Sequence, residues 1–205
     1  MQLRPAVFID KDGTLIENVP YNVDPDRIAL TPGAGPALRA LRDAGFALVL
    51  VSNQSGVALG RFPAAALRGV EDRLAELLAP HGVSLDAVYY CPHAPAPDGT
   101  PTCVCRKPAP GLFFQAARER RLHLRRSWMI GDILNDVEAG RAAGCRTILL
   151  ANGGETEWKL SPGRTPHFTA RTLVEAAQIV LVVDRPAVVL TGGTLVAGSM
   201  AGGRE

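Results

Sequence analysis

The sequence has little that would direct the protein to a membrane or to a nucleic acid. No apolar run approaches the roughly 18 residues that a membrane-spanning helix needs. The 22 Lys and Arg residues nearly balance the 20 Asp and Glu residues, which leaves a formal net charge of +2. This balance gives no reason to expect a nucleic acid or a membrane surface as a partner. The first five residues lead directly into an apolar stretch, so we also expect no signal peptide.

Cysteine is scarce, and its distribution argues against a secreted disulfide framework. The chain has 4 Cys among 205 residues, and three of them fall between residues 91 and 105. Such clustering favours a metal site in a reducing compartment, so we expect a cytoplasmic protein. We also expect a monomer. The length suits one domain with a substantial core, which we assign to residues 1–183. Residues 184–205 are expected to form a tail, either disordered or a small hairpin.

The run Val7–Ile9 ends in two carboxylates, Asp10 and Asp12, followed by Gly13 and Thr14. Bulky apolar residues that stop at a turn signal indicate a buried strand, so Asp10 should lie at the carboxyl edge of a sheet. Open parallel sheets bind ligands at that edge. Two close carboxylates repel each other unless a cation lies between them, and Mg²⁺ suits a site of oxygen ligands. The alternative is a solvated acidic turn.

The remaining chain alternates between predicted strands and helices. Continuous apolar runs predict strands at residues 46–51, 85–90, 127–130 and 146–150. Helices are predicted at residues 33–44, 63–80, 111–121 and 172–179. The first helix should bury four residues: Ala37, Leu38, Leu41 and Ala44. This alternation predicts an α/β fold, a doubly wound parallel sheet with right-handed crossovers.

The second predicted strand leads to Ser52 and Asn53, which should reach the same sheet edge as Asp10. A hydroxyl and backbone N–H groups just past a parallel strand can donate hydrogen bonds to a phosphate oxygen. An ordinary polar turn is the alternative. Further on, Arg106 and Lys107 stand among prolines that fix the backbone. The planar guanidinium of Arg106 could contact phosphoryl oxygens. The alternative here is a solvated basic pair.

Three thiols and one imidazole lie in a single proline-rich segment, residues 91–105, which we call the Cys/His loop. Its potential ligands are Cys91, His93, Cys103 and Cys105. This is the ligand set of a closed, tetrahedral, structural zinc site. Buried thiols beside a surface histidine, or an odd disulfide, are the alternatives. Cys145 stands apart from the group and is predicted to be a core residue.

The segment Asp10–Thr14 resembles the first motif of the haloacid dehalogenase (HAD) phosphatases, and the later motifs follow in order across residues 5–180. Ser52–Gly56 and Cys91–His93 narrow the resemblance to the branch that contains heptose-bisphosphate phosphatase and histidinol-phosphate phosphatase. The resemblance implies the HAD-like Rossmannoid form of the fold. It also implies a small zinc-containing loop in place of a cap domain.

The resemblance further implies a catalytic role for several residues. Asp10 would attack phosphorus and form an aspartyl-phosphate, while Asp12 would act as acid and base. Lys107, Ser52 and Arg106 would hold the phosphoryl oxygens. The implied Mg²⁺ ligands are Asp10, Asp12 and Asp132, with Asp136 orienting them. The implied substrate-binding residues are Asn18, Val19, Pro20, Tyr21, Ser52, Asn53, Gln54, Ser55, Arg106 and Lys107.

These features lead us to expect a Mg²⁺-dependent phosphomonoester hydrolase that removes the 7-phosphate of a heptose 1,7-bisphosphate. Gly56–Phe62 and the long Cys/His loop resemble the heptose branch more than the histidinol-phosphate branch. Ile133 departs from the heptose pattern, in which a lysine stands at this position. Histidinol phosphate or another small phosphosugar is the alternative substrate. An alternative of another class is a non-catalytic, zinc-stabilised module that binds phosphosugar or nucleic acid through Cys105–Lys107.

Overall fold

The computed structural model describes residues 3–98, 100 and 102–184, so the expected tail lies outside it apart from Asp184. Every predicted apolar run forms a strand, and a sixth, short strand follows them. The strands are β1 (Ala6–Ile9), β2 (Ala47–Asn53), β3 (Ala87–Cys91), β4 (Trp128–Gly131), β5 (Arg146–Leu150) and β6 (Phe168–Ala170). The helices are α1 (Ala34–Asp43), α2 (Ala66–Leu78), α3 (Gly111–Arg120), α4 (Leu134–Ala142) and α5 (Leu173–Val183). Short 3-10 turns occur at Pro25–Arg27, Ala79–His81, Leu124–Arg126 and Pro162–Arg164.

The strands form one parallel sheet in the order β3-β2-β1-β4-β5-β6. The chain builds outward from β1 to β3, then crosses back and continues from β4 on the other side of β1. Phe8 of β1 therefore pairs with Val49 on one side and with Met129 on the other. The strand order reverses between β1 and β4, and this is the point where open α/β sheets bind ligands.

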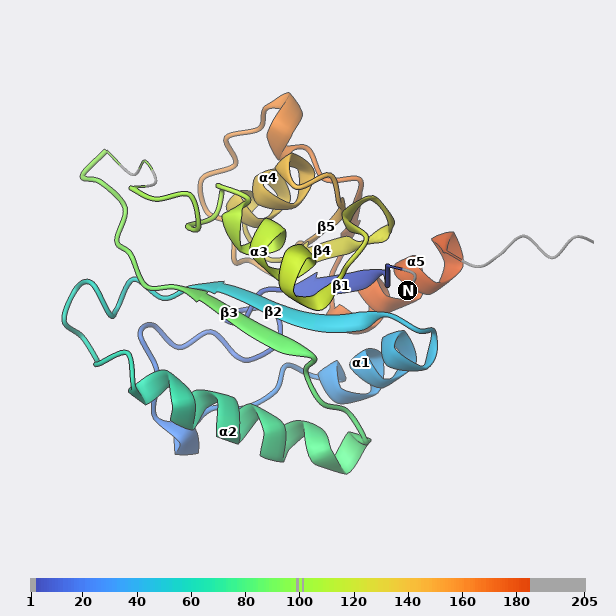
Figure 1. The fold of residues 1–205 in the computed structure, drawn as a ribbon, viewed down its shortest axis with the longest axis horizontal. Helices are drawn as coiled ribbons and strands as arrows, with labels where there is room; N and C mark the ends of the chain where they lie inside the picture. The colour runs from blue at the N-terminus through green and yellow to red at the C-terminus, as the bar shows by residue number, and fades with distance from the viewer. Residues whose placement is uncertain (1–2, 99, 101, 185–205) are drawn as a thin grey trace, which may run out of the picture.

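Helices cover both faces of the sheet, which makes it doubly wound (Figure 1). Val7 and Ile9 of β1 belong to the core that α1, α2 and α5 cover. Phe8 points to the opposite face and packs on Phe113 of α3, with ring centres 4.8 Å apart. Because β1 is covered on both faces, it reads as a continuous apolar run instead of an alternating one.

One residue that was predicted to be buried is exposed in the structure, and another is buried as predicted. Ala44 is exposed at the end of α1, whereas the other three predicted core residues of that helix are buried. Gly45 has a φ of 91° and turns the chain away directly after it, so the apolar stripe ends at Leu41 and not at Ala44. Cys145 is buried in the core between α4 and β5, as predicted.

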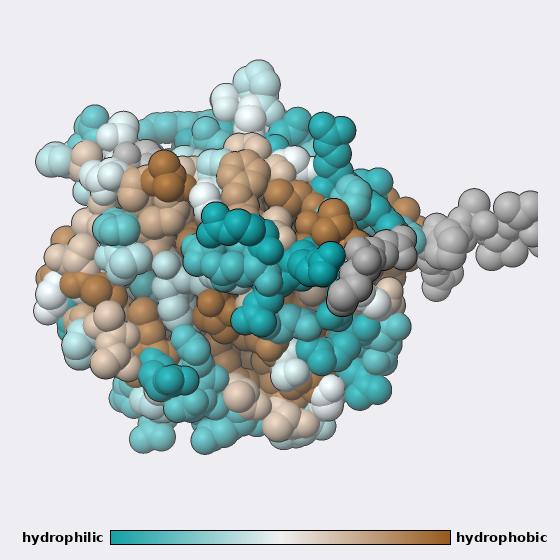
Figure 2. Space-filling view, viewed as in Figure 1, coloured by the Kyte–Doolittle hydropathy of each residue, from teal (hydrophilic) through white to brown (hydrophobic). Residues whose placement is uncertain are grey.

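On the face shown in Figure 2, apolar residues lie in scattered patches between polar ones. Within the described part of the chain, no helix is long and apolar enough to cross a membrane. The Cys/His loop leaves the end of β3 as an irregular extension beside the sheet edge (Figure 1). No insertion in the described residues is long enough to form a separate cap domain, which agrees with the predicted loop-type cap.

Candidate active site

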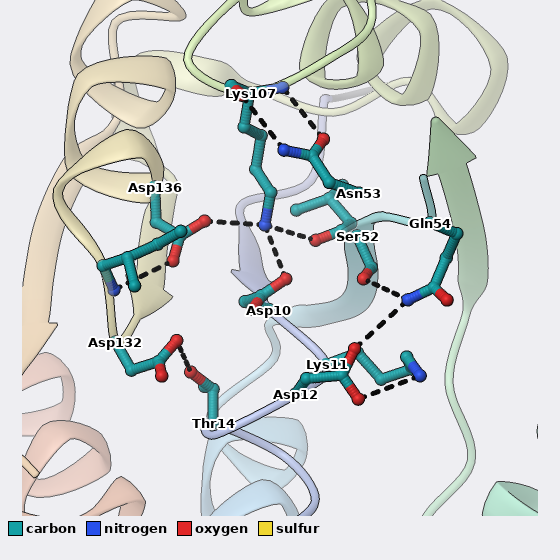
Figure 3. Close-up of polar contacts among 12 residues, drawn as sticks. Asp10, Lys11, Asp12, Thr14, Ser52, Asn53, Gln54, Lys107, Asp132 and Asp136 are labelled. Carbon is teal, nitrogen blue, oxygen red and sulfur yellow. Dashed lines mark hydrogen bonds and ion pairs between the residues drawn. The ribbon is translucent and has the colours of Figure 1, made fainter. Parts of the chain in front are cut away.

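Asp10 follows β1 at the point where the strand order reverses. Its backbone N–H donates to the carbonyl of Ile130 at 3.0 Å, which continues the ladder to β4 and fixes the residue between the two halves of the sheet. Its carboxylate meets Lys107, whose ammonium lies 2.5 Å from Asp10 Oδ1 and 2.6 Å from Asp136 Oδ1 (Figure 3). The carbonyl of Val51 accepts a third bond at 3.0 Å. Lys107 thus joins Asp10 after β1, Val51 of β2 and Asp136 of α4.

Lys107 keeps its charge although its side chain is only 2% exposed. Burial alone would lower the pKa of Lys107, but the adjacent carboxylates of Asp10 and Asp136 raise it above its usual value. All three ammonium hydrogens have acceptors. The side chain is therefore a fixed positive charge beside Asp10.

Asp10, Asp132 and Asp136 form a cluster in which one oxygen of each lies within 4.8 Å of the others. Burial, and then the charges of Asp136 and Asp10, raise the pKa of Asp132 to about 7. Burial raises the pKa of Asp136 to about 6, against the opposing effect of Lys107. The cluster carries more negative charge than Lys107 offsets, so it suits a further cation. An all-oxygen donor set of this kind fits Mg²⁺.

Glycines bring the backbone against this cluster at three places. A Cβ on Gly13 or on Gly154 would come within 2.2 Å or 2.0 Å of Asp132 Oδ2, and one on Gly131 would come within 2.2 Å of Asp136 Oδ2. Gly13 also has a φ of 76°, which a larger residue would adopt only under strain. Any side chain here would fill the space around the carboxylates.

The loop after β5 makes two hydrogen bonds to the segments that carry the acidic cluster. Asn152 Nδ2 donates to the carbonyl of Gly13 at 2.7 Å. Glu155 Oε2 accepts from the N–H of Leu134, also at 2.7 Å, and so caps α4, the helix that carries Asp136. Ile133, at the N-cap position, has no side-chain acceptor to do this. Sequence reasoning missed both roles, although the lack of a cap at Ile133 could have indicated that one comes from elsewhere.

Asp12 lies apart from the three-carboxylate cluster. Its carboxylate pairs with the buried Lys11 at 3.0 Å and accepts from Gln54 Nε2 at 3.2 Å. Gln54 also donates to Ser52 Oγ at 3.0 Å, which leaves the Ser52 hydroxyl hydrogen free to donate to another acceptor. Burial, together with the charge of Asp10, raises the pKa of Asp12 in spite of Lys11. Among the described residues, the acidic cluster that could hold a metal does not include the Asp12 carboxylate, so its role as a Mg²⁺ ligand stays a prediction.

Asn53 and Arg106 have backbone partners in the structure. Both amide atoms of the Asn53 side chain bond to the backbone of Lys107, each at 3.0 Å. Asn53 therefore anchors the segment that carries the lysine. One guanidinium nitrogen of Arg106 donates to the carbonyl of His93 at 3.1 Å, which ties Arg106 to the Cys/His loop.

A cavity of about 260 Å³ opens beside Asp12 and brings together residues of the loops after β1 and β2. We call it the Asp12 cavity. Val19 does not line it, although its neighbours do. The lining residues are Asp12, Asn18, Pro20, Tyr21, Asn53, Gln54, Ser55 and Gly56. A second cavity, of about 380 Å³, adjoins Asp132 from the side of β5.

The four potential ligands of the Cys/His loop converge. The sulfur of Cys105 lies 3.2 Å from those of Cys91 and Cys103, and 3.3 Å from Nδ1 of His93. These separations exclude disulfides, which need about 2.05 Å between sulfurs. One ligand atom of each residue lies within 4.8 Å of the others, as the corners of a tetrahedral zinc site require. The donor set and its closeness both fit zinc.

A carboxylate at a strand end, a fixed ammonium and an acidic cluster suited to Mg²⁺ together indicate an enzyme of phosphoryl transfer, because they offer a nucleophile and the positive charges that can hold phosphoryl oxygens. Comparisons with known proteins agree. Residues 104–176 match the model of the HAD-hydrolase-like family. D-glycero-beta-D-manno-heptose-1,7-bisphosphate 7-phosphatase from Yersinia pestis is 40% identical over 156 residues, covering 74% of this chain and 82% of the relative. The enzyme of the same name from Escherichia coli K12 is 38% identical over 154 residues, with 74% and 81% covered.

Solved structures give the same result. D,D-heptose 1,7-bisphosphate phosphatase from B. bronchiseptica, complexed with magnesium and phosphate, superposes with a TM-score of 0.73 at 32% identity, covering 89% of this chain and 99% of that one. A putative HAD-like phosphatase from Mesorhizobium loti also gives 0.73, at 33% identity, with 91% and 90% covered. The chain belongs to the HAD phosphatases, in the family of the heptose-bisphosphate phosphatases. It is therefore an enzyme, which excludes the non-catalytic alternative.

Proposed function

We propose that the protein hydrolyses the 7-phosphate of a heptose 1,7-bisphosphate through an aspartyl-phosphate at Asp10. The observation that carries this proposal is the contact of Asp10 with Lys107, in a cluster of carboxylates next to the Asp12 cavity. A phosphate seated against Lys107 would lie beside one carboxylate that can attack and another that can carry a proton. The names of the relatives support the heptose bisphosphate as the substrate.

Mg²⁺ would be held by Asp10 and Asp132, which share one cluster with Asp136. Asp12 remains the third ligand that the family resemblance implies. When bound, it supplies positive charge to the transferring phosphoryl group. The raised pKa of Asp132 supports this assignment, because a bound cation would offset both the burial and the neighbouring negative charges that raise it. The magnesium in the B. bronchiseptica structure supports it as well.

In the first step, an oxygen of Asp10 attacks phosphorus in line with the bond to the sugar oxygen. Lys107 orients the Asp10 carboxylate, and it offers positive charge to an equatorial phosphoryl oxygen. The free hydroxyl hydrogen of Ser52 donates to another such oxygen. Arg106, which its bond to His93 keeps beside Lys107, can supply a further donor.

Asp12 acts as the acid and then as the base. Its raised pKa favours the protonated form that must give a proton to the departing sugar oxygen. In the second step it accepts a proton from the water that attacks the aspartyl-phosphate. The amide of Gln54 bonds to both Asp12 and Ser52. It therefore fixes the distance between the proton donor, Asp12, and the hydroxyl of Ser52 that would bind a phosphoryl oxygen.

Zinc in the Cys/His loop would be structural. Three thiolates and one imidazole fill a tetrahedral shell and leave no position for a reacting water. Its role would be to hold the segment that leads directly into Arg106 and Lys107. We also propose that the protein is a cytoplasmic monomer. Residues 1–183 would form the phosphatase domain, and residues 184–205 would form a tail.

The test is phosphate release from heptose 1,7-bisphosphate and from histidinol phosphate, with and without Mg²⁺. Wild type should require Mg²⁺ and favour the bisphosphate in kcat/KM. Asp10→Asn should abolish turnover while the far-ultraviolet circular dichroism spectrum stays unchanged. Asp72→Asn, on the exposed side of α2, is the matched control and should keep full activity. Near wild-type activity of Asp10→Asn would refute the mechanism, and a preference for histidinol phosphate would refute the substrate.

A further inference from the structure

The segment after Ser55 folds back on the turn that follows β2. The backbone N–H of Arg61 donates to the carbonyl of Gly56 at 2.8 Å, and that of Leu59 donates to Ser55 at 3.0 Å. The ring of Phe62, only 7% exposed, packs so closely on Gly56 that a Cβ there would come within 2.2 Å of it. The segment is therefore anchored, and Arg61 has a defined place next to the Asp12 cavity.

Arg61 contacts the other loop that lines this cavity. Its guanidinium carbon lies 5.6 Å from the centre of the Tyr21 ring, within the range of a cation–π contact. Tyr21 has a φ of 54°, an uncommon value for a residue with a bulky side chain, and it is 51% exposed. Tyr21 and Gly56 both line the Asp12 cavity. The Arg61–Tyr21 stack thus joins the loops after β1 and β2 at this cavity.

The charge of Arg61 is not offset by an acidic side chain, since no carboxylate among the described residues pairs with it. Two other cations near the site are paired with carboxylates: Lys11 with Asp12, and Lys107 with Asp10. Arg106 instead donates to the carbonyl of His93. The apolar side chain of Ile133, which follows Asp132 in the sequence, offers no hydrogen-bond donor to a phosphate. Arg61 is therefore available to an anion that enters the Asp12 cavity.

We propose that Arg61, stacked on Tyr21, binds the phosphate of the substrate that is not cleaved. This inference rests on the proposed function, in which Asp12 protonates the departing sugar oxygen. The leaving sugar must then lie beside Asp12, and in a sugar bisphosphate it carries the second phosphate into the same cavity. A guanidinium held over an aromatic ring by a cation–π contact can still offer N–H groups for a bidentate bond to phosphate. The stack also fixes the arginine before the substrate binds, which lowers the entropy lost on binding.

The experiment compares kcat/KM for heptose 1,7-bisphosphate with kcat/KM for heptose 7-phosphate, which has the same scissile group but no second phosphate. Arg61→Ala should lower the ratio of the two values about 10-fold to 100-fold, as expected for a lost charged hydrogen bond. Arg61→Lys should lose part of the ratio, because it keeps the charge without the planar fork. Arg68→Ala, an exposed arginine on α2, is the matched control and should leave the ratio unchanged.

The Tyr21 variants test the stack itself. Tyr21→Phe keeps the ring and should keep the ratio, whereas Tyr21→Ala should lower it in wild type but not further in Arg61→Ala. An unchanged ratio in Arg61→Ala would overturn the inference while the phosphatase assignment stands, and a ratio lowered by Arg106→Ala alone would move the contact to Arg106. Failure of wild type to cleave either heptose phosphate would overturn the proposed function, and this inference with it.

Discussion

Replacing Asp132 by Asn should stabilise the protein in the absence of Mg²⁺, although it removes a proposed metal ligand. The carboxylate is only 4% exposed and lies in one cluster with Asp10 and Asp136. Burial and these two charges raise its pKa from 3.8 to about 7. Between these pH values the folded protein keeps a proton that the unfolded chain loses, so this group makes stability fall as pH rises from about 4 to about 7.

The size of the effect follows from that difference in pKa. Each unit corresponds to about 1.4 kcal/mol, so an isolated group would cost up to about 4 kcal/mol above pH 7. Because the repulsion is shared with Asp136 and the site can relax, we expect about 1–3 kcal/mol, or roughly 3–10 °C in Tm for a chain of this size. Near pH 4 the gain from Asp132→Asn should vanish, since wild-type Asp132 is then protonated in the folded state.

The assay is thermal unfolding from pH 4.5 to 8.5 in buffer depleted of Mg²⁺ by resin, without a chelator that would also remove zinc. Adding Mg²⁺ at pH 8 should raise the Tm of wild type and leave Asp132→Asn unchanged. Asp72→Asn, which neutralises an exposed carboxylate, should show neither effect. Parallel pH curves for wild type and Asp132→Asn would refute the reasoning, as would a Tm of the variant that rises with Mg²⁺ as much as that of wild type.

Three further substitutions test the roles of single residues. Asp12→Asn should lower kcat about 10²- to 10⁴-fold on the sugar phosphate but much less on 4-nitrophenyl phosphate, whose leaving group needs no proton; equal losses would contradict acid catalysis by Asp12. Cys103→Ser should release zinc, measured by metal analysis, and raise KM, because the loop before Arg106 loosens; unchanged zinc content would contradict the assignment of this ligand. Ile133→Lys should raise the preference for bisphosphate over monophosphate about tenfold or more by adding a second cation, and an unchanged preference would place Ile133 away from the substrate.

The sequence predicted most of the sheet but not its last strand. β1, β2 and β5 are buried on both faces, so their apolar runs are visible in the sequence. β6 has only three residues, of which Phe168 and Thr169 are exposed. Three residues at the edge of a sheet are too few to show the alternation of apolar and polar residues that indicates a strand. The strand forms because β5 offers it a hydrogen-bonding partner.

The sequence predicted the charged residues of the candidate site, because each stands beside a recognisable local pattern. It did not predict the hydrogen bonds between distant residues that position them. Asp10 and Asp132 directly follow strands, and Lys107 directly precedes a proline, so each of these patterns lies within a few positions. The bond between Glu155 and Leu134 joins residues 21 positions apart, and that between Asn53 and Lys107 spans 54. Such pairs arise from the folded path of the chain, which residue type and spacing do not encode.

The position of the Cys/His loop in the chain has a consequence for the order of folding. Cys91 and Cys105 are 14 positions apart, whereas Lys107 and Asp10 are separated by 97. Closing the shorter loop costs less chain entropy and occurs sooner than long-range pairing. Zinc bound by these four residues would therefore organise the connection from β3 to α3 while the two halves of the sheet are still separate. Lys107 would then reach Asp10 as part of a preformed segment, and refolding with zinc present should recover activity faster than refolding without it.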